Sequence, residues 1–268
     1  MTLTVPAAER RPVRFRGRGF VISPRPVAPF VAFALVIIVW EAASRAGLID
    51  ALTLPAPSAI ATALYDIARD GTLWKNLGIS LWRIALGWSL GTVLGLVVGV
   101  MMGVSSLSRA VGMSFVAALF PIPKVALLPL FILWLGIGET SKVATIALGV
   151  FFPTVIAVYS GIDSVPANLI RMAQSFEATP ASILRKVILP GALPNIIAGF
   201  RISSSIALIL LVSAEMIGAE AGIGAYVLQT GNMMMTENLL AGVTALSIIG
   251  ILISSAISAV ERFALKWR

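Results

Sequence analysis

Long apolar runs alternate with short polar segments along the chain. Six of these runs approach the roughly 20 residues that a helix needs to cross the hydrocarbon core of a bilayer. They lie at residues 28–47, 83–104, 112–136, 142–161, 196–218 and 239–260. One polar stretch, "RMAQSFEATPASILRKVILPGALPNI" (171–196), separates the fourth run from the fifth. The pattern predicts an all-α integral membrane protein with six transmembrane helices in a domain over 27–262, interrupted by a polar loop at 162–195.

The positions of the basic residues predict which side of the membrane each loop faces. Six spans place both termini on one side, and if that side is inside, 14 of the 20 Lys and Arg residues lie there. These are Arg10, Arg11, Arg14, Arg16, Arg18, Arg25, Arg109, Arg171, Arg185, Lys186, Arg201, Arg262, Lys266 and Arg268. The outer side receives Arg45, Arg69, Lys75, Arg83 and Lys142, while Lys124 falls within the third span. This excess predicts that both termini and the 162–195 loop are cytoplasmic.

The two ends of the chain are short and basic. Residues 1–26 are predicted to form a basic cytoplasmic arm, and residues 263–268 are predicted to form a short cytoplasmic tail. A cleaved secretory signal ending near "EAASRA" (41–46) is the alternative for the amino terminus. It is disfavoured because the charged region is too long and the apolar run that follows can span the membrane by itself.

Composition places the chain in lipid and narrows its chemistry. Charged residues make up 12% of the chain and the mean hydropathy is +0.97, whereas soluble domains carry roughly 25% charged residues. The net charge of +8 favours membrane lipid over nucleic acid as a partner, because the basic residues flank apolar runs. The chain has no Cys and no His, which excludes disulfides and thiolate or imidazole metal sites.

No set of residues predicts catalysis, a metal site or a cofactor site. The chain lacks paired carboxylates at a useful spacing, and without His it has no triad. The segment "GIGETSK" (136–142) comes nearest to a nucleotide-binding loop, but it lacks the GxxxxGK[ST] spacing and a preceding strand. The chain is therefore predicted not to be an enzyme, and any ATP and Mg that drive it belong to another chain.

Five glycines follow one another at four-residue spacing in the second run. They are Gly87, Gly91, Gly95, Gly99 and Gly103. On a helix they form one flat stripe that lets another backbone approach closely, an extended form of the GxxxG interface. The spacing predicts a helix-packing face and leaves open whether the partner helix belongs to the same chain or to another subunit.

Prolines interrupt the third and fourth runs and mark a candidate substrate pathway. Three lie within "LFPIPKVALLPLFILWLG" (119–136), and Pro153 lies in the fourth run. A helix distorted by proline at membrane depth is tolerated only where protein or a water-filled cavity covers it. The candidate pathway residues are Lys124, Pro123, Ser204 and Glu215.

Three of the candidate pathway residues also have an interpretation without substrate. Lys124 either meets the pathway or extends its ammonium to the membrane interface, and the sequence leaves both open. Glu215 suits a structural or gating role better than substrate contact. Ser204 belongs to a run of three serines that could line a path, although serine more often serves packing between membrane helices.

The polar stretch carries signals for a short helix. Thr179 predicts an N-cap, and Pro180 fits the first turn, where its missing N–H is not needed. Four apolar residues then share one face and two basic residues take the other: Ile183, Leu184, Val187, Ile188, with Arg185 and Lys186 opposite. The segment "LPGALP" (189–194) predicts the end of this helix. Such a helix either enters a groove on a partner protein or lies on the membrane surface.

The end of this stretch, "LPGALPNIIAGFRI" (189–202), resembles a known family. It is similar to the cytoplasmic loop of permease subunits of bacterial ABC importers, whose pattern is Glu-Ala-Ala-x-x-x-Gly followed, after a spacer, by Ile-x-Leu-Pro. The matching positions here are Arg171, Met172, Ala173, Glu177, Leu189 and Pro190. Arg171 stands where the family has an acid and Glu177 where it has glycine, so the tight turn that glycine would make at 177 is left open.

Four further segments are similar to the nitrate, sulfonate and taurine group of these permeases. They are "LPAPSAI" (54–60), "SLWRIALGW" (80–88), "PIPKVALLPLFILWLGIGETSK" (121–142) and "FFPTVIAVYSGIDSVP" (151–166). The resemblance covers about residues 35 to 262 in order. It is highly specific for the type of subunit and only weakly specific for the substrate.

The resemblance implies the type I permease fold of ABC importers and the parts of a larger assembly in the bacterial inner membrane. Two permease subunits, often identical, form the substrate pathway. Two cytoplasmic ATPases hold ATP and Mg, and a periplasmic or lipid-anchored binding protein delivers the substrate. A small anion such as a sulfonate, taurine or nitrate is expected, while thiamine-precursor pyrimidines, riboflavin, bicarbonate and aromatic acids stay open.

The resemblance also implies that the polar stretch couples the permease to the ATPase. The residues expected to serve this contact are Arg171, Ala173, Phe176, Glu177, Ala178, Thr179, Pro180, Arg185, Leu189 and Pro190. An ATP-independent secondary transporter or channel is the alternative of another class, but such proteins more often show an internal repeat or intramembrane acid and base pairs. A membrane scaffold without a pathway is a further alternative, against which the broken third run argues.

Overall fold

The structure is a computed structural model that describes residues 27–266. The predicted basic arm (1–26) and residues 267–268 of the predicted tail lie outside the described residues. Within the described part every regular element is a helix, which confirms the all-α fold class. The chain divides into two units, Met1–Pro57 and Ser58–Arg268, and each is described by itself.

The first unit contains one helix, α1 (Ala28–Arg45), among its described residues. Many of its side chains are large, apolar and exposed, among them Phe30, Phe33 and Ile38. The helix ends just before Gly47, which adopts a left-handed φ of 72° that suits glycine. A helix with so much exposed apolar surface needs lipid or another protein surface around it.

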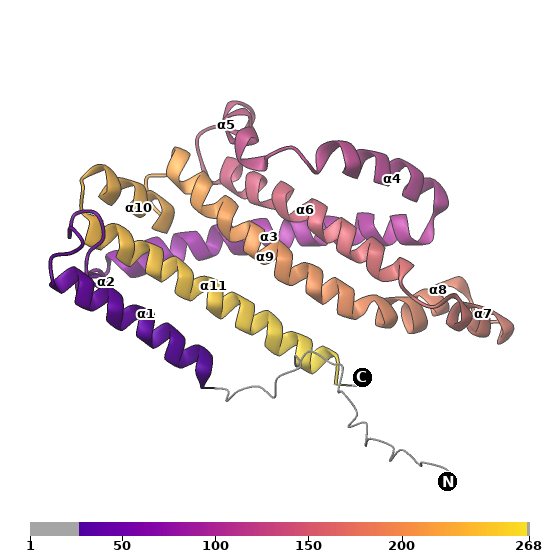
Figure 1. The fold of residues 1–268 in the computed structure, drawn as a ribbon. Helices are drawn as coiled ribbons and strands as arrows, with labels where there is room; N and C mark the ends of the chain where they lie inside the picture. Colours follow the sequence, from indigo (N-terminus) through magenta and orange to yellow (C-terminus); the bar gives the residue numbers. More distant parts are fainter. Residues whose placement is uncertain (1–26, 267–268) are drawn as a thin grey trace, which may run out of the picture. The chain divides into compact units, whose positions relative to one another are not determined.

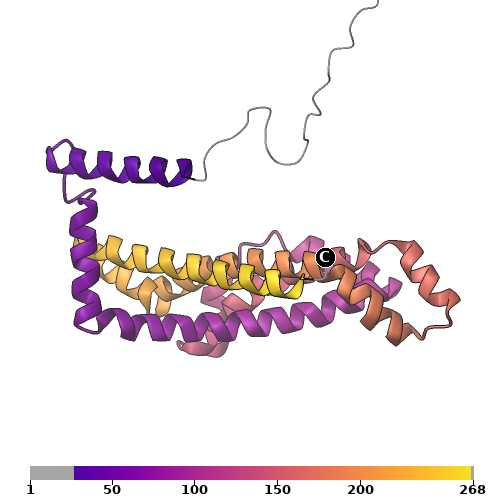
Figure 2. The same cartoon turned by 90° about the horizontal axis from the view of Figure 1, so that it is seen from below.

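The second unit is built around four long helices (Figures 1 and 2). They are α3 (Thr72–Val104), α6 (Glu139–Asp163), α9 (Leu189–Gly218) and α11 (Thr236–Ala264). The shorter elements are α2 (Pro57–Arg69), α4 (Ser106–Leu119), the 3-10 turn η1 (Lys124–Leu127), α5 (Leu128–Leu135), α7 (Ala167–Ser175), α8 (Pro180–Ile183), the π-helical turn η2 (Leu184–Ile188) and α10 (Ile223–Asn232). Helix α6 packs against α3 and α9, and α11 packs against α9. In both views α7 and α8 lie at one end of this bundle and α10 lies at the other.

Four segments of the described chain are long and apolar enough to cross a membrane. They are Thr72–Val104, Glu139–Asp163, Pro180–Gly218 and Thr236–Ala264, and a fifth arises if α4 and the η1–α5 segment form one broken span. At 1.5 Å per residue, the 33 residues of α3 extend about 50 Å, well beyond a hydrocarbon core of about 30 Å. The helices therefore account for four or five of the six predicted spans.

All four long helices begin before the predicted apolar runs, and α3 and α6 do so at runs that were predicted to begin with a charged residue. Helix α3 begins at Thr72 and not at 83, and α6 begins at Glu139 and not at 142. The predicted runs begin at Arg83 and Lys142 because a charged residue ordinarily marks the membrane interface. Both side chains are instead buried against protein, with 3% and 4% exposure, so neither marks the end of its helix.

The five-glycine stripe of α3 lies against α6 of the same chain. A Cβ atom at Gly91 would lie 2.4 Å from the carbonyl oxygen of Ala147, and one at Gly95 would lie 2.7 Å from the Cβ atom of Thr154. Opposite the stripe, α6 presents buried β-branched residues that are also spaced by four: Ile146, Val150, Thr154, Val158 and Ile162. This ridge fills the groove that the glycines leave, so the two backbones approach closely.

The third predicted span is broken in its middle. Helix α4 and the η1–α5 segment meet at an angle of 86° across residues 120–123. Pro121 and Pro123 lie in this break, and neither can donate a backbone hydrogen bond. The bend makes this part of the chain either a broken span or a re-entrant segment. Pro153, by contrast, lies inside α6 without ending it.

The prediction that "LPGALP" ends the helix of the polar stretch is wrong. Helical structure continues from Pro180 through the π-helical turn η2 into α9 and on to Gly218. The π turn shifts the hydrogen-bond register just ahead of Pro190, which needs no donor in the first turn of α9. Pro194 is then carried inside α9.

We expect the α3–α6 contact to be sensitive to a single methyl group. Gly95→Ala places a Cβ atom where Thr154 and the Phe151 carbonyl already lie, so the helices must move apart, and we expect a loss of roughly 1–3 kcal/mol of stability. Gly78→Ala, on the same helix but facing open space, should be neutral or slightly stabilising. Thermal unfolding of the purified chain in detergent compares the two, and equal effects would contradict the close packing.

Candidate functional site

A cluster of three charged residues, two of them buried, links three helices near the α10 end of the second unit. Arg83 comes from α3, Glu139 from the first turn of α6 and Glu215 from the last turn of α9. The side chain of Arg83 is 3% exposed and that of Glu215 is fully buried. Buried charges of this kind depend on one another, because a protein interior solvates an isolated ion poorly.

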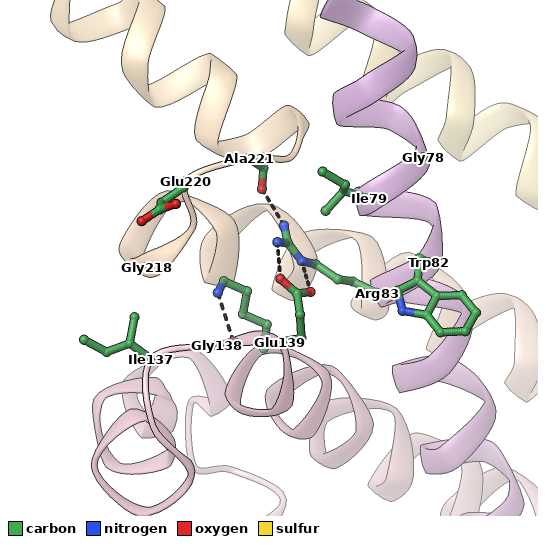
Figure 3. A pocket seen from close by; sticks show the side chains of 11 residues that line it. Gly78, Ile79, Trp82, Arg83, Ile137, Gly138, Glu139, Gly218, Glu220 and Ala221 are labelled. Carbon is green, nitrogen blue, oxygen red and sulfur yellow. Dashed lines mark hydrogen bonds and ion pairs between the residues drawn. The ribbon is translucent and has the colours of Figure 1, made fainter.

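Arg83 contacts both carboxylates at once, and Figure 3 shows its contact with Glu139. Its Nε and Nη2 atoms donate to the two oxygens of Glu139 at 2.6 Å each, which makes a bidentate ion pair. Its Nη1 atom donates to Glu215 at 2.8 Å and to the carbonyl oxygen of Ala221 at 2.6 Å. One guanidinium therefore ties α3 to the start of α6, to the end of α9 and to the turn between α9 and α10.

Glu215 has its own set of donors from α3 and from the start of α10. The Ser80 hydroxyl donates to it at 2.7 Å, and the backbone N–H of Gly224 donates at 2.8 Å. The backbone N–H of Ile223 donates in turn to the Ser80 hydroxyl at 2.9 Å. Gly222 fits here for two reasons: its φ is 125°, and a Cβ atom would lie 2.4 Å from the Glu215 carboxylate.

A cavity of about 530 Å³ lies beside Arg83, bounded by α3, the α5–α6 turn and the α9–α10 turn (Figure 3). Trp82 and Ile137 give it apolar surface. Lys142 also lines it, and its Nζ atom donates to the Gly138 carbonyl at 2.9 Å. The cavity therefore combines two buried cations with carboxylates and apolar side chains, in the size range of small-ligand pockets.

Lys124 and Pro123 lie at the break between α4 and α5. The Lys124 ammonium donates to three backbone carbonyl oxygens within residues 119–122, at 2.7 to 2.8 Å. It also lies 4.7 Å from the centroid of the Phe152 ring. Lys124 thus caps carbonyl groups that the broken helix leaves without helical partners, and the adjoining Pro123 is exposed.

Ser204 and Glu215 both belong to α9 but lie in different environments. Ser204 lines an apolar cavity of about 220 Å³ between α3, α9 and α11, and its hydroxyl donates to the Arg201 carbonyl. Glu215 joins Arg83 and Glu139, which sequence reasoning did not propose as functional residues. Their signal in the sequence is a charge at the edge of an apolar run, which a topology prediction assigns to the interface.

The polar stretch forms a helical hairpin at the other end of the unit (Figure 1). Helix α7 closes in a Schellman ending, in which the N–H of Ala178 donates to Ala173 and that of Glu177 donates to Gln174. Glu177 has a left-handed φ of 56°, a conformation that costs a residue other than glycine roughly 1–2 kcal/mol. The tight turn at 177 is therefore present although the residue is not glycine.

Beyond the turn, Thr179 caps α8 as the sequence predicts. Its hydroxyl accepts a hydrogen bond from the Ser182 N–H at 3.3 Å. Phe176 lies just before the turn with 77% of its surface exposed. Of the other residues expected to meet an ATPase, those that are exposed are Arg171, Glu177, Thr179, Pro180 and Arg185, and those that are half-buried are Ala173, Ala178, Leu189 and Pro190.

The chain matches known proteins along most of its length. Residues 91–266 match the family described as binding-protein-dependent transport system inner membrane component. This chain belongs to that family. The protein named as aliphatic sulfonates transport permease SsuC of Bacillus subtilis is 37% identical over 235 residues, 88% of this chain and 85% of the relative. The taurine transport system permease protein TauC of Escherichia coli is 38% identical over 239 residues, 87% of each chain.

Solved structures of ABC transporters share the fold of this inner membrane component. An inward-facing form of the MetNI methionine ABC transporter matches with a TM-score of 0.59 and 26% identity, over 69% of this chain and 93% of that chain. An amino acid ABC transporter matches with a TM-score of 0.55 and 17% identity, over 76% and 97% of the two chains. The second likeness is one of fold alone.

We expect the Arg83 cluster to dominate the electrostatic contribution to stability. Arg83→Met leaves Glu215 buried without its cation, which should lower the free energy of unfolding by about 3–5 kcal/mol. Arg201→Met removes a half-exposed pair with Glu261 and should cost only about 0–1 kcal/mol. Unfolding by SDS in mixed micelles measures both variants. Similar small losses would mean that Glu215 does not depend on Arg83.

Proposed function

We propose that this chain is the permease subunit of an ATP-driven importer of sulfonates, with taurine and aliphatic sulfonates as the substrate class. The similarity to SsuC and TauC over 88% and 87% of the chain carries the proposal. A sulfonate keeps its negative charge throughout the physiological pH range, so it needs a protein route through lipid. The buried cations near the α10 end of the bundle are compatible with an anion on that route.

We infer six spans with both termini in the cytoplasm. The four long segments and the broken α4–α5 segment supply five, and α1 is the candidate for the sixth. Its 18 residues extend about 27 Å, close to the thickness of the hydrocarbon core. The excess of basic residues on the side of the 162–195 loop supports this orientation. The permease domain then covers 27–262, with a basic arm at 1–26 and a tail at 263–268.

The importer assembles from several chains in the bacterial inner membrane. A second permease copy, identical or related, pairs with this one, and apolar side chains such as Val93, Val97 and Ile251 remain exposed for that contact or for lipid. Two cytoplasmic ATPases hold ATP and Mg and carry out hydrolysis, so this chain is not an enzyme. A periplasmic or lipid-anchored binding protein delivers substrate at the α10 end.

Lys124, Pro123 and Glu215 are assigned to the pathway and its gate, and Ser204 to packing.

The α7–α8 hairpin is the element that couples the permease to its ATPase. Its shape is fixed locally by the Schellman ending at Glu177 and the Thr179 cap, so it enters a partner groove without a large loss of entropy. Phe176 offers an exposed aromatic anchor at the tip, the kind of residue that dominates binding energy at interfaces. The hairpin continues directly into α9, so a displacement at the ATPase reaches a membrane span.

ATP-dependent uptake tests the function. The chain is reconstituted in liposomes with its partner ATPase and binding protein, and uptake of labelled taurine and of ethanesulfonate is followed. We expect uptake only when ATP and all three components are present. Uptake of either sulfonate by the purified chain alone would identify an ATP-independent transporter and contradict the proposal. Uptake of nitrate in place of either sulfonate by the complete system would overturn the substrate class.

Co-purification tests the coupling contact. Phe176→Ala should weaken binding of the ATPase by at least about 30-fold, which corresponds to about 2 kcal/mol at an interface hot spot. Phe263→Ala is the matched control, because Phe263 is equally exposed, at 73% against 77%, but lies at the end of α11. The amount of ATPase that co-purifies with each variant measures the effect of each substitution. If the two variants retain it equally, Phe176 is not the anchor.

A further inference from the structure

We propose that the guanidinium fork of Arg83 binds the sulfonate group of the substrate, and that Glu139 occupies this fork until the substrate displaces it. The inference rests on the proposed function, because it takes the substrate to be a sulfonate. It assigns a binding site within the permease itself, beside the cavity of about 530 Å³. Glu139 then occupies the anion site when no substrate is bound.

The two carboxylates on Arg83 are held very differently. Glu215 is fully buried, and Ser80 and the backbone of Gly224 hold it in place. The side chain of Glu139 is 55% exposed. Glu139 directly follows Gly138, where a Cβ atom would meet nothing within 4 Å, and Gly136, with a left-handed φ of 83°, lies three residues before it. Glu215 is therefore the permanent partner of Arg83, and Glu139 is the partner that can leave.

The fork that Glu139 occupies has the geometry that an oxyanion needs. The Nε and Nη2 atoms of Arg83 each donate at 2.6 Å to a different oxygen of one carboxylate. Arginine binds planar pairs of oxygens in this bidentate way in carboxylates and phosphates alike. A sulfonate presents three oxygens on one sulfur, so any two of them can take the places of the Glu139 oxygens.

Charge balance also favours an exchange. Arg83 and Lys142 supply two buried positive charges, and the two carboxylates in contact with Arg83, Glu139 and Glu215, supply two negative ones. Glu220 also lines the cavity, but it is exposed to water, which screens its charge. If Glu139 turned outward with nothing in its place, the cluster would keep an uncompensated positive charge, which is costly away from water. A bound sulfonate restores the balance, so departure of Glu139 and arrival of the anion are coupled.

The cavity offers room and surface for the remainder of the substrate. Figure 3 shows Arg83 at its centre, with Ile79, Trp82 and Ile137 around it. These side chains suit the short carbon chain of an aliphatic sulfonate, which makes no hydrogen bonds. Trp82 and Ile137 are 61% and 83% exposed, so the apolar side of the cavity is open.

Direct binding of labelled taurine to the full chain in lipid nanodiscs tests the site, with unlabelled ethanesulfonate as the competitor. Glu139→Gln keeps the shape of the side chain but removes its negative charge, which weakens its hydrogen bonds to Arg83. Taurine should therefore bind about ten-fold more tightly. Arg83→Lys keeps the charge and loses the fork, so binding should weaken by about ten-fold or more. Glu237→Gln is the matched control, because Glu237 is also an acid in the first turn of a long helix, α11. The affinity of this variant for taurine should equal that of the unmodified chain.

Unchanged or weaker binding by Glu139→Gln overturns the proposal, and so does unchanged binding by Arg83→Lys. If Arg83→Lys does not fold, Glu139→Gln decides alone, because it removes no partner from the buried Glu215. Absence of measurable taurine binding by both the unmodified chain and Glu139→Gln overturns the site as well. If the complete importer takes up sulfonate while these binding results fail, the site is wrong and the proposed function stands. If the complete importer takes up no sulfonate, the proposed function falls.

Discussion

The second unit depends on the close approach of α3 to α6. The glycine stripe of α3 and the β-branched ridge of α6 hold the two backbones together from Gly87 and Ile146 to Gly103 and Ile162. Arg83 continues the four-residue period of the stripe, and Lys142 continues that of the ridge. The packing that places the glycines of α3 against the β-branched residues of α6 therefore also places Arg83 and Lys142 in the interior. Positive charges there require a nearby acid, and Glu215 of α9 supplies it. Helix packing and the charged cluster are consequences of one register between two helices.

Ion pairs also join other neighbouring helices, but each of them contributes less to stability than the Arg83 cluster. Arg109 pairs with Asp163 between α4 and α6, and Arg201 pairs with Glu261 between α9 and α11. Their side chains are between one third and just over one half exposed, so water and salt weaken these pairs. Arg83 and Glu215 have no such screening. The cluster near the α10 end is thus the electrostatic anchor of the bundle, and the outer pairs adjust the positions of α4 and α11.

The sequence was sufficient for features that depend on nearby residues. Apolar length predicts the spanning helices, the glycine spacing predicts a packing face, and Thr179 with Pro180 predicts the start of α8. Features that join distant residues were missed: Arg83 lies 132 positions from Glu215 and 56 from Glu139, and a charge at the edge of an apolar run is ordinarily read as a membrane boundary. The "LPGALP" prediction failed because a π turn accommodates proline where an α-helix alone would end. At Glu177 the local backbone hydrogen bonds impose the turn on a residue that disfavours it.

The continuous helical segment from Pro180 to Gly218, which includes the π turn, places α8 of the hairpin and the buried acid on one body. Its 39 residues extend about 58 Å at 1.5 Å per residue. If that body tilts by only about 5° around its hairpin end, the opposite end sweeps an arc of about 5 Å, a displacement far larger than a hydrogen bond tolerates. A small angular change at the hairpin end is therefore enough to pull Glu215 away from Arg83.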